Sequence, residues 1–197
     1  MLLGFLTVLI MLVVAYAFWR QGVLPALVMA LNVFLAGLVA FNFFEVVATE
    51  LDPMLADSFL HGYEDSLCLI VLFCVMLAFL RWAANALIHT TIEYHPVLQQ
   101  GGAVLFGLMT GYLVAGFLLC VAQTLPFEEH FLHFEAHIDT HAPGAKARRI
   151  LPPDRVWLAL MHRASETALS WDNTLFDPDG SFELRYSRER RTSDEKN

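Results

Sequence analysis

The chain of 197 residues is 57% hydrophobic and 16% charged, with a net charge of −8 and a mean hydropathy of +0.53. In ordinary soluble domains about a quarter of the residues are charged, so this composition argues against that class and indicates a protein of the lipid bilayer. The charges are also unevenly placed, because Arg20 and Arg81 are the only Lys or Arg residues before residue 126.

Four apolar stretches follow one another from the N-terminus. Each approaches or exceeds the roughly 18 to 20 residues that a helix needs to cross a hydrocarbon core. The first, Leu2 to Trp19, also resembles a signal peptide, because "AYA" at residues 15–17 looks like a cleavage site. It lacks a basic leading segment and continues to a short link that suits a tight helical hairpin, so we favour a membrane span. The other three stretches are Val23 to about Phe44, roughly Ser66 to Ile88, and Gly101 to Ala122.

These stretches lack the alternating pattern of barrel strands, and backbone groups in lipid find partners only within helices or closed barrels. The sequence therefore predicts an all-α integral membrane protein with four transmembrane helices in residues 1–125. In the acidic link after the second span, Asp52 and Pro53 are expected to break any helix that continues out of the membrane. Cys68, Cys74 and Cys120 fall within the spans and are expected to act as small apolar residues.

The two arginines predict the orientation of the spans. Lys and Arg in short loops mark the cytoplasmic side of a membrane protein. Arg20 lies between the first two spans and Arg81 near the end of the third, on the same predicted side. Both termini are therefore expected outside the cytoplasm.

The fourth span carries a stripe of small residues at every fourth position, which lie on one face of a helix. Small residues let helix backbones approach closely in lipid. Packing within the chain is the favoured interpretation, and homodimerisation is the alternative. The stripe consists of Ala103, Gly107, Gly111 and Ala115.

A second set of candidates is polar but uncharged. Asn32, Asn42, Asn85 and Thr110 lie at or near membrane depth, where they are expected to form hydrogen bonds between helices. A polar conduction path near the three asparagines is the alternative. We consider it weaker because such paths usually contain ionisable residues at mid-membrane depth.

Residues 126–197 form an extramembrane C-terminal segment in this interpretation, because most of the basic residues lie there. An amphipathic helix is predicted from Pro153 or Asp154, a turn and a strand-like run near residues 177–186, and a disordered tail after that. The apolar face of the helix contains Trp157, Leu160, Met161, Ala164 and Ala168.

Four histidines about one helical turn apart begin this segment: His130, His133, His137 and His141. Pairs four residues apart, such as His133 with His137, have the spacing of zinc or nickel ligands on a helix, and protonation would charge the whole stripe. Neighbouring aromatic residues favour a simpler role at the headgroup boundary. We therefore expect no metal site and no other cofactor.

The order of these pieces resembles the colicin V production protein family over about residues 1 to 126. The similar features are a span ending in an Arg-containing hairpin, two further spans joined by polar links, and the glycine-rich "GGAVLFGLMTGYLVAGFLLCVAQTLPF". The resemblance implies a small inner-membrane protein of four helices, linked to colicin V production and without established catalytic activity. The sequence departs from the family pattern at Gln99 and Gln100, where an Asp-Arg pair is usual.

Together these observations lead us to expect a non-enzymatic accessory or scaffold protein of the bacterial inner membrane. It would act in the lipid bilayer through membrane protein partners or as a homo-oligomer, and no nucleic-acid partner is expected. No phosphate loop, nucleophile elbow or other catalytic motif is found in the sequence. The alternative is a small channel or transporter with a polar path near Asn32, Asn42 and Asn85.

Overall fold

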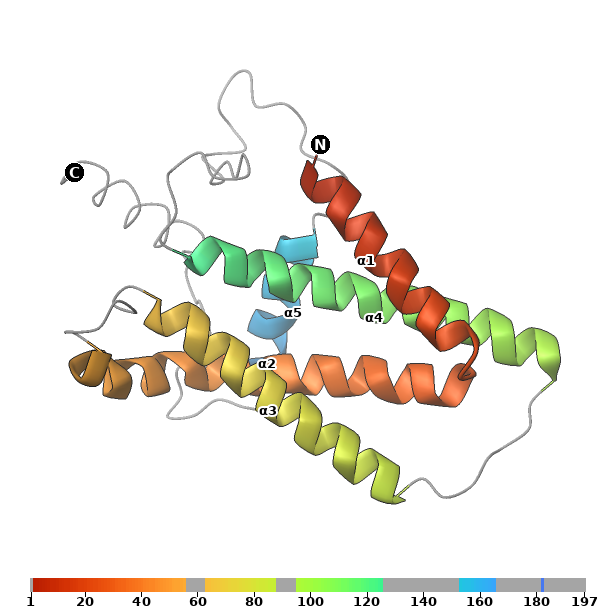
Figure 1. Cartoon of the computed structure of the whole chain (residues 1–197), viewed down its shortest axis with the longest axis horizontal. Helices are drawn as coiled ribbons and strands as arrows, with labels where there is room; N and C mark the ends of the chain where they lie inside the picture. Colours follow the sequence, from red (N-terminus) through yellow and green to blue (C-terminus); the bar gives the residue numbers. More distant parts are fainter. Residues whose placement is uncertain (1, 56–62, 88–94, 126–152, 166–181, 183–197) are drawn as a thin grey trace.

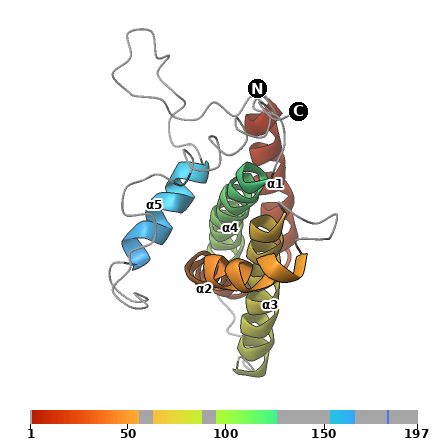
Figure 2. The same cartoon turned by 90° about the vertical axis from the view of Figure 1, so that its left-hand side faces the viewer.

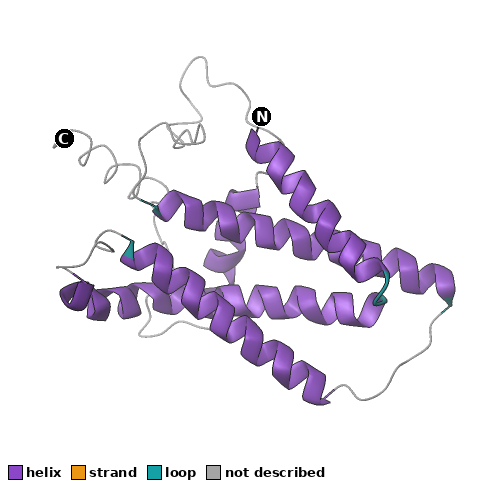
Figure 3. Ribbon diagram, viewed as in Figure 1, coloured by secondary structure: helices purple, strands orange, loops and turns teal. Residues whose placement is uncertain are grey.

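The computed structural model describes residues 2–55, 63–87, 95–125, 153–165 and 182. These residues are helical apart from short turns, and none of them forms a strand (Figure 3). The histidine stripe, the strand-like run beyond Phe182 and the tail all lie outside the described residues. The helices are α1 (Leu2–Trp19), α2 (Val23–Leu55), α3 (Glu64–Leu87), α4 (Pro96–Thr124) and α5 (Pro153–Ser165).

Prolines lie in the first turns of three of these helices. Pro25 follows the start of α2 by two residues, while Pro96 and Pro153 are the first residues of α4 and α5. A proline is tolerated there because the first N–H groups of a helix have no partner within the helix. Each apolar run can therefore begin as a regular helix, even in lipid.

Helix α2 is longer than the sequence predicts, and the expected break at Asp52 and Pro53 is wrong. The helix continues to Leu55. Proline removes its own N–H bond to the carbonyl four residues earlier and crowds that carbonyl, and here the helix ends two residues after Pro53. At 33 residues, α2 is roughly 50 Å long, well beyond a hydrocarbon core of about 30 Å.

Helices α2 and α4 form the centre of the molecule and run side by side in the same direction (Figure 1). Helix α1 packs mainly against α4, and α3 packs mainly against α2. Helix α5 crosses the central pair on the side away from α1 and α3 (Figure 2). Although α1 and α2 form a hairpin, they touch little beyond their turn.

The turn between α1 and α2 defines one end of the molecule, which we call the hairpin end. The backbone N–H groups of Gln21 and Gly22 both donate to the Phe18 carbonyl oxygen, at 2.9 and 3.1 Å. Gly22 has a φ of 96°, in the left-handed region that favours glycine. The chain reverses here within three residues, as the predicted link requires.

Aromatic side chains fill the main core between α2, α3, α4 and α5. The rings of Phe73 and Phe117 stack with centroids 3.9 Å apart, which joins α3 to α4. Phe41 of α2 makes edge contacts with Phe117 and Trp157 at 6.2 and 6.1 Å. Phe182 packs against the same α2 ring at 6.0 Å. The core therefore includes residues from the segment assigned outside the membrane.

Candidate functional site

The small-residue stripe of α4 lies mostly against α1. A Cβ atom added at Gly107 would lie 2.8 Å from the Cα of Ala15, and one added at Gly111 would lie 2.6 Å from the Cα of Met11. Carbon atoms that are not bonded do not approach so closely. The backbones of α1 and α4 can therefore touch only because Gly107 and Gly111 have no side chain. Ala103 and Ala115, the other members of the stripe, are also buried.

A second pair of glycines, one on α2 and one on α4, makes room for Trp157 of α5. A Cβ at Gly37 would lie 2.2 Å from the indole Cζ2 of Trp157, and one at Gly116 would lie 2.5 Å from the Pro153 carbonyl oxygen and 3.0 Å from the Trp157 Cβ. We call this recess between Gly37 and Gly116 the glycine notch. The indole is only 1% exposed, and no described residue accepts a hydrogen bond from its N–H. Shape and ring contacts therefore hold it in place.

The start of α5 is also joined to α4 by polar contacts. The side-chain amide of Gln123 donates to the Asp154 carboxylate at 3.0 Å, and the Cys120 thiol lies 3.8 Å from the Asp154 carbonyl oxygen. Asp154 is in the first turn of α5, where a negative charge is favoured by the helix dipole. These contacts fix the start of α5 beside the last turns of α4.

The predicted polar residues do not lie together. Thr110 and Asn42 donate to carbonyl oxygens of their own helices, those of Phe106 and Leu38, at 2.7 Å each. These bonds run within a helix, whereas bonds between helices were expected. Asn32 is buried in α2, and Asn85 is exposed on α3.

One polar contact between long helices involves two residues that were not among the candidates from the sequence. The hydroxyl oxygens of Ser66 and Thr124 are 2.8 Å apart, and both side chains are buried. Thr124 also donates to the Val121 carbonyl oxygen at 2.8 Å. A hydroxyl has one proton to donate, so Ser66 is the donor in the contact that joins α3 to α4.

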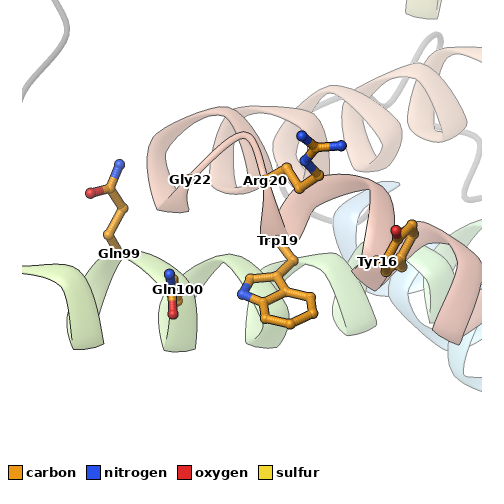
Figure 4. A pocket seen from close by; sticks show the side chains of 6 residues that line it. All are labelled: Tyr16, Trp19, Arg20, Gly22, Gln99 and Gln100. Carbon is orange, nitrogen blue, oxygen red and sulfur yellow. The ribbon is translucent and has the colours of Figure 1, made fainter.

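A pocket of about 520 Å³ opens at the hairpin end, between the end of α1, its turn and the first turns of α4 (Figure 4). The sequence analysis used Arg20 only to orient the spans and did not detect the pocket. One signal was present, since Tyr16, Trp19 and Arg20 are spaced to share a helical face. The lining residues are Tyr16, Trp19, Arg20, Gly22, Gln99 and Gln100.

The two low-ranked metal ligands of the sequence analysis, His133 and His137, lie outside the described residues. Within the part of the chain that the structure describes, no three His, Cys, Asp or Glu side chains gather as a metal ion would require.

Three helical segments are long and apolar enough to cross a membrane, namely Val23–Leu51, Glu64–Leu87 and Val97–Thr124. The apolar segment of α1, Gly4–Trp19, is shorter. With their helix-to-helix packing, these segments define an all-α, multi-pass membrane protein.

Residues 3–136 match the family model of the colicin V production protein, and the chain belongs to this family. This match supports a membrane accessory role in colicin V production. No curated protein and no solved structure gives a significant match to the chain.

Proposed function

We propose that the protein is a non-enzymatic accessory or scaffold protein that supports colicin V production by holding protein partners in the bacterial inner membrane. The family match supports the process, and the absence of a catalytic motif in the sequence supports a role without catalysis. The proposal assigns partner binding mainly to α3.

The observation that carries this assignment is the openness of α3. Only 17% of the residues along its apolar stretch are buried, against 56% for α4. Helix α4 is enclosed by α1, α2 and α5, whereas α3 packs on α2 and only slightly on α4. Helices in lipid associate through direct packing, so a largely uncovered helix offers a surface to a partner helix.

The packing of α1 supports four spans, as the sequence predicts. Met11 and Ala15 of α1 meet Gly111 and Gly107 of α4, so α1 lies at the same depth as a helix long enough to span. Its 18 residues extend roughly 27 Å, close to the thickness of a hydrocarbon core.

We further propose that the hairpin end faces the cytoplasm and that both termini face away from it. Arg20 is in the turn at this end, and the Arg81 guanidinium of α3 reaches the Met29 sulfur of α2 at 3.4 Å. Both basic side chains thus belong to one side of the membrane, as the positive-inside rule requires.

The proposal is tested by adding bulk to the open face of α3. Val75 is 63% exposed on α3 and Val8 is 53% exposed on α1, so they form a matched pair. In cells that depend on this chain for colicin V production, Val75→Trp should lower secretion of the toxin. Val8→Trp should leave it unchanged. Equal secretion by both variants at equal protein levels would contradict the role of α3.

The chain also carries a native probe on this face. Cys74 is exposed, whereas Cys68 and Cys120 are buried. A thiol-reactive photocrosslinker attached to Cys74 in membranes should yield a reproducible protein adduct that is absent from Cys74→Ser carrying Val8→Cys. Only lipid adducts from both positions would argue against partner binding.

Flux measurements test the channel alternative. Liposomes containing the purified protein should show no small-ion flux above the protein-free background. A flux that disappears when Asn32, Asn42 and Asn85 are replaced by leucine would favour a channel instead.

A further inference from the structure

The pocket at the hairpin end is built from two segments that the fold brings together. Trp19 and Arg20 end α1, and Gln99 and Gln100 lie in the first turns of α4 (Figure 4). A Cβ at Gly22 would lie 3.1 Å from the Gln99 amide nitrogen. The glycine therefore lets this amide lie directly against the turn.

Every side chain that lines the pocket can donate a hydrogen bond. Arg20 supplies a guanidinium, Gln99 and Gln100 supply amides, Trp19 an indole N–H, and Tyr16 a hydroxyl. The rings of Tyr16 and Trp19 meet edge to face with centroids 6.5 Å apart. A pocket with several donors and a permanent positive charge suits a ligand rich in acceptors, such as a phosphate group.

The electrostatics at this end also favour an anion. None of the described Asp and Glu residues lies near the pocket, because they occur after the middle of α2 and at the starts of α3 and α5. The N-termini of α2 and α4 lie at the hairpin end together with the C-termini of α1 and α3 (Figure 1). The helix dipoles therefore largely offset one another at this end, and Arg20 supplies the positive charge at the pocket.

The surface of α1 next to the pocket is apolar. Leu9, Val13 and Tyr16 precede Arg20 at helical spacing, and they are 44%, 60% and 65% exposed. This stripe runs from the pocket into the depth of the membrane. It therefore offers a path for acyl chains attached to a headgroup at the pocket, which a free phosphate would not use.

We propose that the pocket binds the phosphate group of an anionic phospholipid, with Arg20 as the main ligand. Gln99, Gln100 and Trp19 donate the remaining hydrogen bonds, and the acyl chains lie along the Leu9, Val13 and Tyr16 stripe of α1. The site differs from the open face of α3 and belongs to a different part of the molecule.

The experiment measures lipid binding to the purified full chain by native mass spectrometry, with phosphatidylglycerol as the probe in neutral detergent. We expect one tightly bound phosphatidylglycerol per chain, held more strongly than phosphatidylcholine. Arg20→Gln should weaken this binding by roughly tenfold, because a hydrogen bond to a charged group is lost. Arg81→Gln is the matched control, since Arg81 is exposed but does not line the pocket. The affinity of this variant for phosphatidylglycerol should stay within about twofold of that of the wild type.

A second pair of variants guards against misfolding of Arg20→Gln. Replacing Gln99 and Gln100 by leucine should also weaken phosphatidylglycerol binding severalfold and leave the charge of the chain unchanged. Helical content and thermal stability are compared for all variants. Because no protein partner is present, the result is independent of the proposed accessory function.

Three outcomes would overturn the proposal. Wild-type affinity in both the Arg20→Gln and the glutamine variants would show that the pocket is not the site. Equal loss in Arg81→Gln would indicate general charge attraction. Binding of inorganic phosphate or glycerol phosphate as tight as that of phosphatidylglycerol would assign the pocket to a free phosphate ligand rather than to a lipid.

Discussion

Helix α4 meets α1 and α5 through glycine residues, but the two contacts differ in what occupies the space next to each glycine. At Gly111 the neighbour is the backbone of Met11, whereas in the glycine notch the neighbour of Gly37 is the indole ring of Trp157; Gly116 meets both the Pro153 carbonyl oxygen and the Trp157 Cβ. Backbone contact depends on the absence of any side chain, while a notch depends on the match between a recess and one ring. The two contacts should therefore respond differently to the same substitutions.

The largest effect is expected from removing the ring that fills the notch. Trp157→Ala should lower the free energy of unfolding by about 3 to 5 kcal/mol, because it leaves a cavity between Phe41, Phe117 and the two glycines. Leu160→Ala on the same helix is the control, since Leu160 is 36% exposed, and it should cost less than about 1 kcal/mol. Unfolding by a denaturing detergent, followed by circular dichroism, measures both. Similar losses in the two variants would mean that the notch contributes little.

The backbone contact is tested by one methyl group at two glycines of α4. Gly111→Ala should destabilise the protein by about 1 to 3 kcal/mol, because the methyl group meets the Met11 backbone. Gly101 has no atom within 4 Å of its added Cβ, so Gly101→Ala should stabilise the helix by up to about 1 kcal/mol. The same unfolding assay compares the two variants. If both substitutions changed the free energy of unfolding in the same direction, close packing of α1 against α4 would be unimportant.

A compensation experiment separates the two contacts directly. Trp157→Phe removes the ring atoms that would clash with a methyl group at Gly37, so the double variant with Gly37→Ala should be about 1 to 2 kcal/mol more stable than additivity predicts. Met11→Ala should give no such rescue of Gly111→Ala, because the obstructing atom belongs to the backbone. Rescue in both pairs, or in neither, would remove the distinction between a notch and a backbone contact.

The smallest effect is expected where a hydrogen bond rather than packing joins two helices. Ser66→Ala should cost about 0.6 kcal/mol, the average for such bonds in membrane proteins. Thr49 is exposed and bonds within its own helix, to the Glu45 carbonyl at 2.7 Å, so Thr49→Val serves as the control with no measurable change expected. If Ser66→Ala lowered the free energy of unfolding by more than about 2 kcal/mol, this hydrogen bond would stabilise the protein as much as the glycine contacts do.

The sequence predicts the helices well because each helix depends mainly on residues close together in the chain. Each apolar run must form its own hydrogen bonds in lipid, so the run from Leu2 to Trp19 is α1 without change. The end of α2 is predicted wrongly because a proline only disfavours the helix at the residue before it, and the helix continues to Leu55. The pattern of apolar residues is therefore sufficient to predict where most helices lie.

Contacts between segments are harder to predict. Spacing identifies the small face of α4, but it does not say whether α1 or a second chain lies there. The notch combines Gly37, Gly116 and Trp157, which are far apart in the sequence, and an isolated glycine in an apolar run has no pattern that marks a recess. The pocket likewise depends on a turn at Gly22 that brings the end of α1 beside Gln99. Such features follow from packing, which a linear pattern does not encode.

The glycine notch also has a consequence for the order in which the molecule is assembled. A ribosome makes α2 and α4 before it makes α5, so both walls of the recess exist before Trp157 is available to fill it. During that interval no residue of α5 fills the recess. Docking of the Trp157 indole therefore requires that α2 and α4 are already paired in parallel.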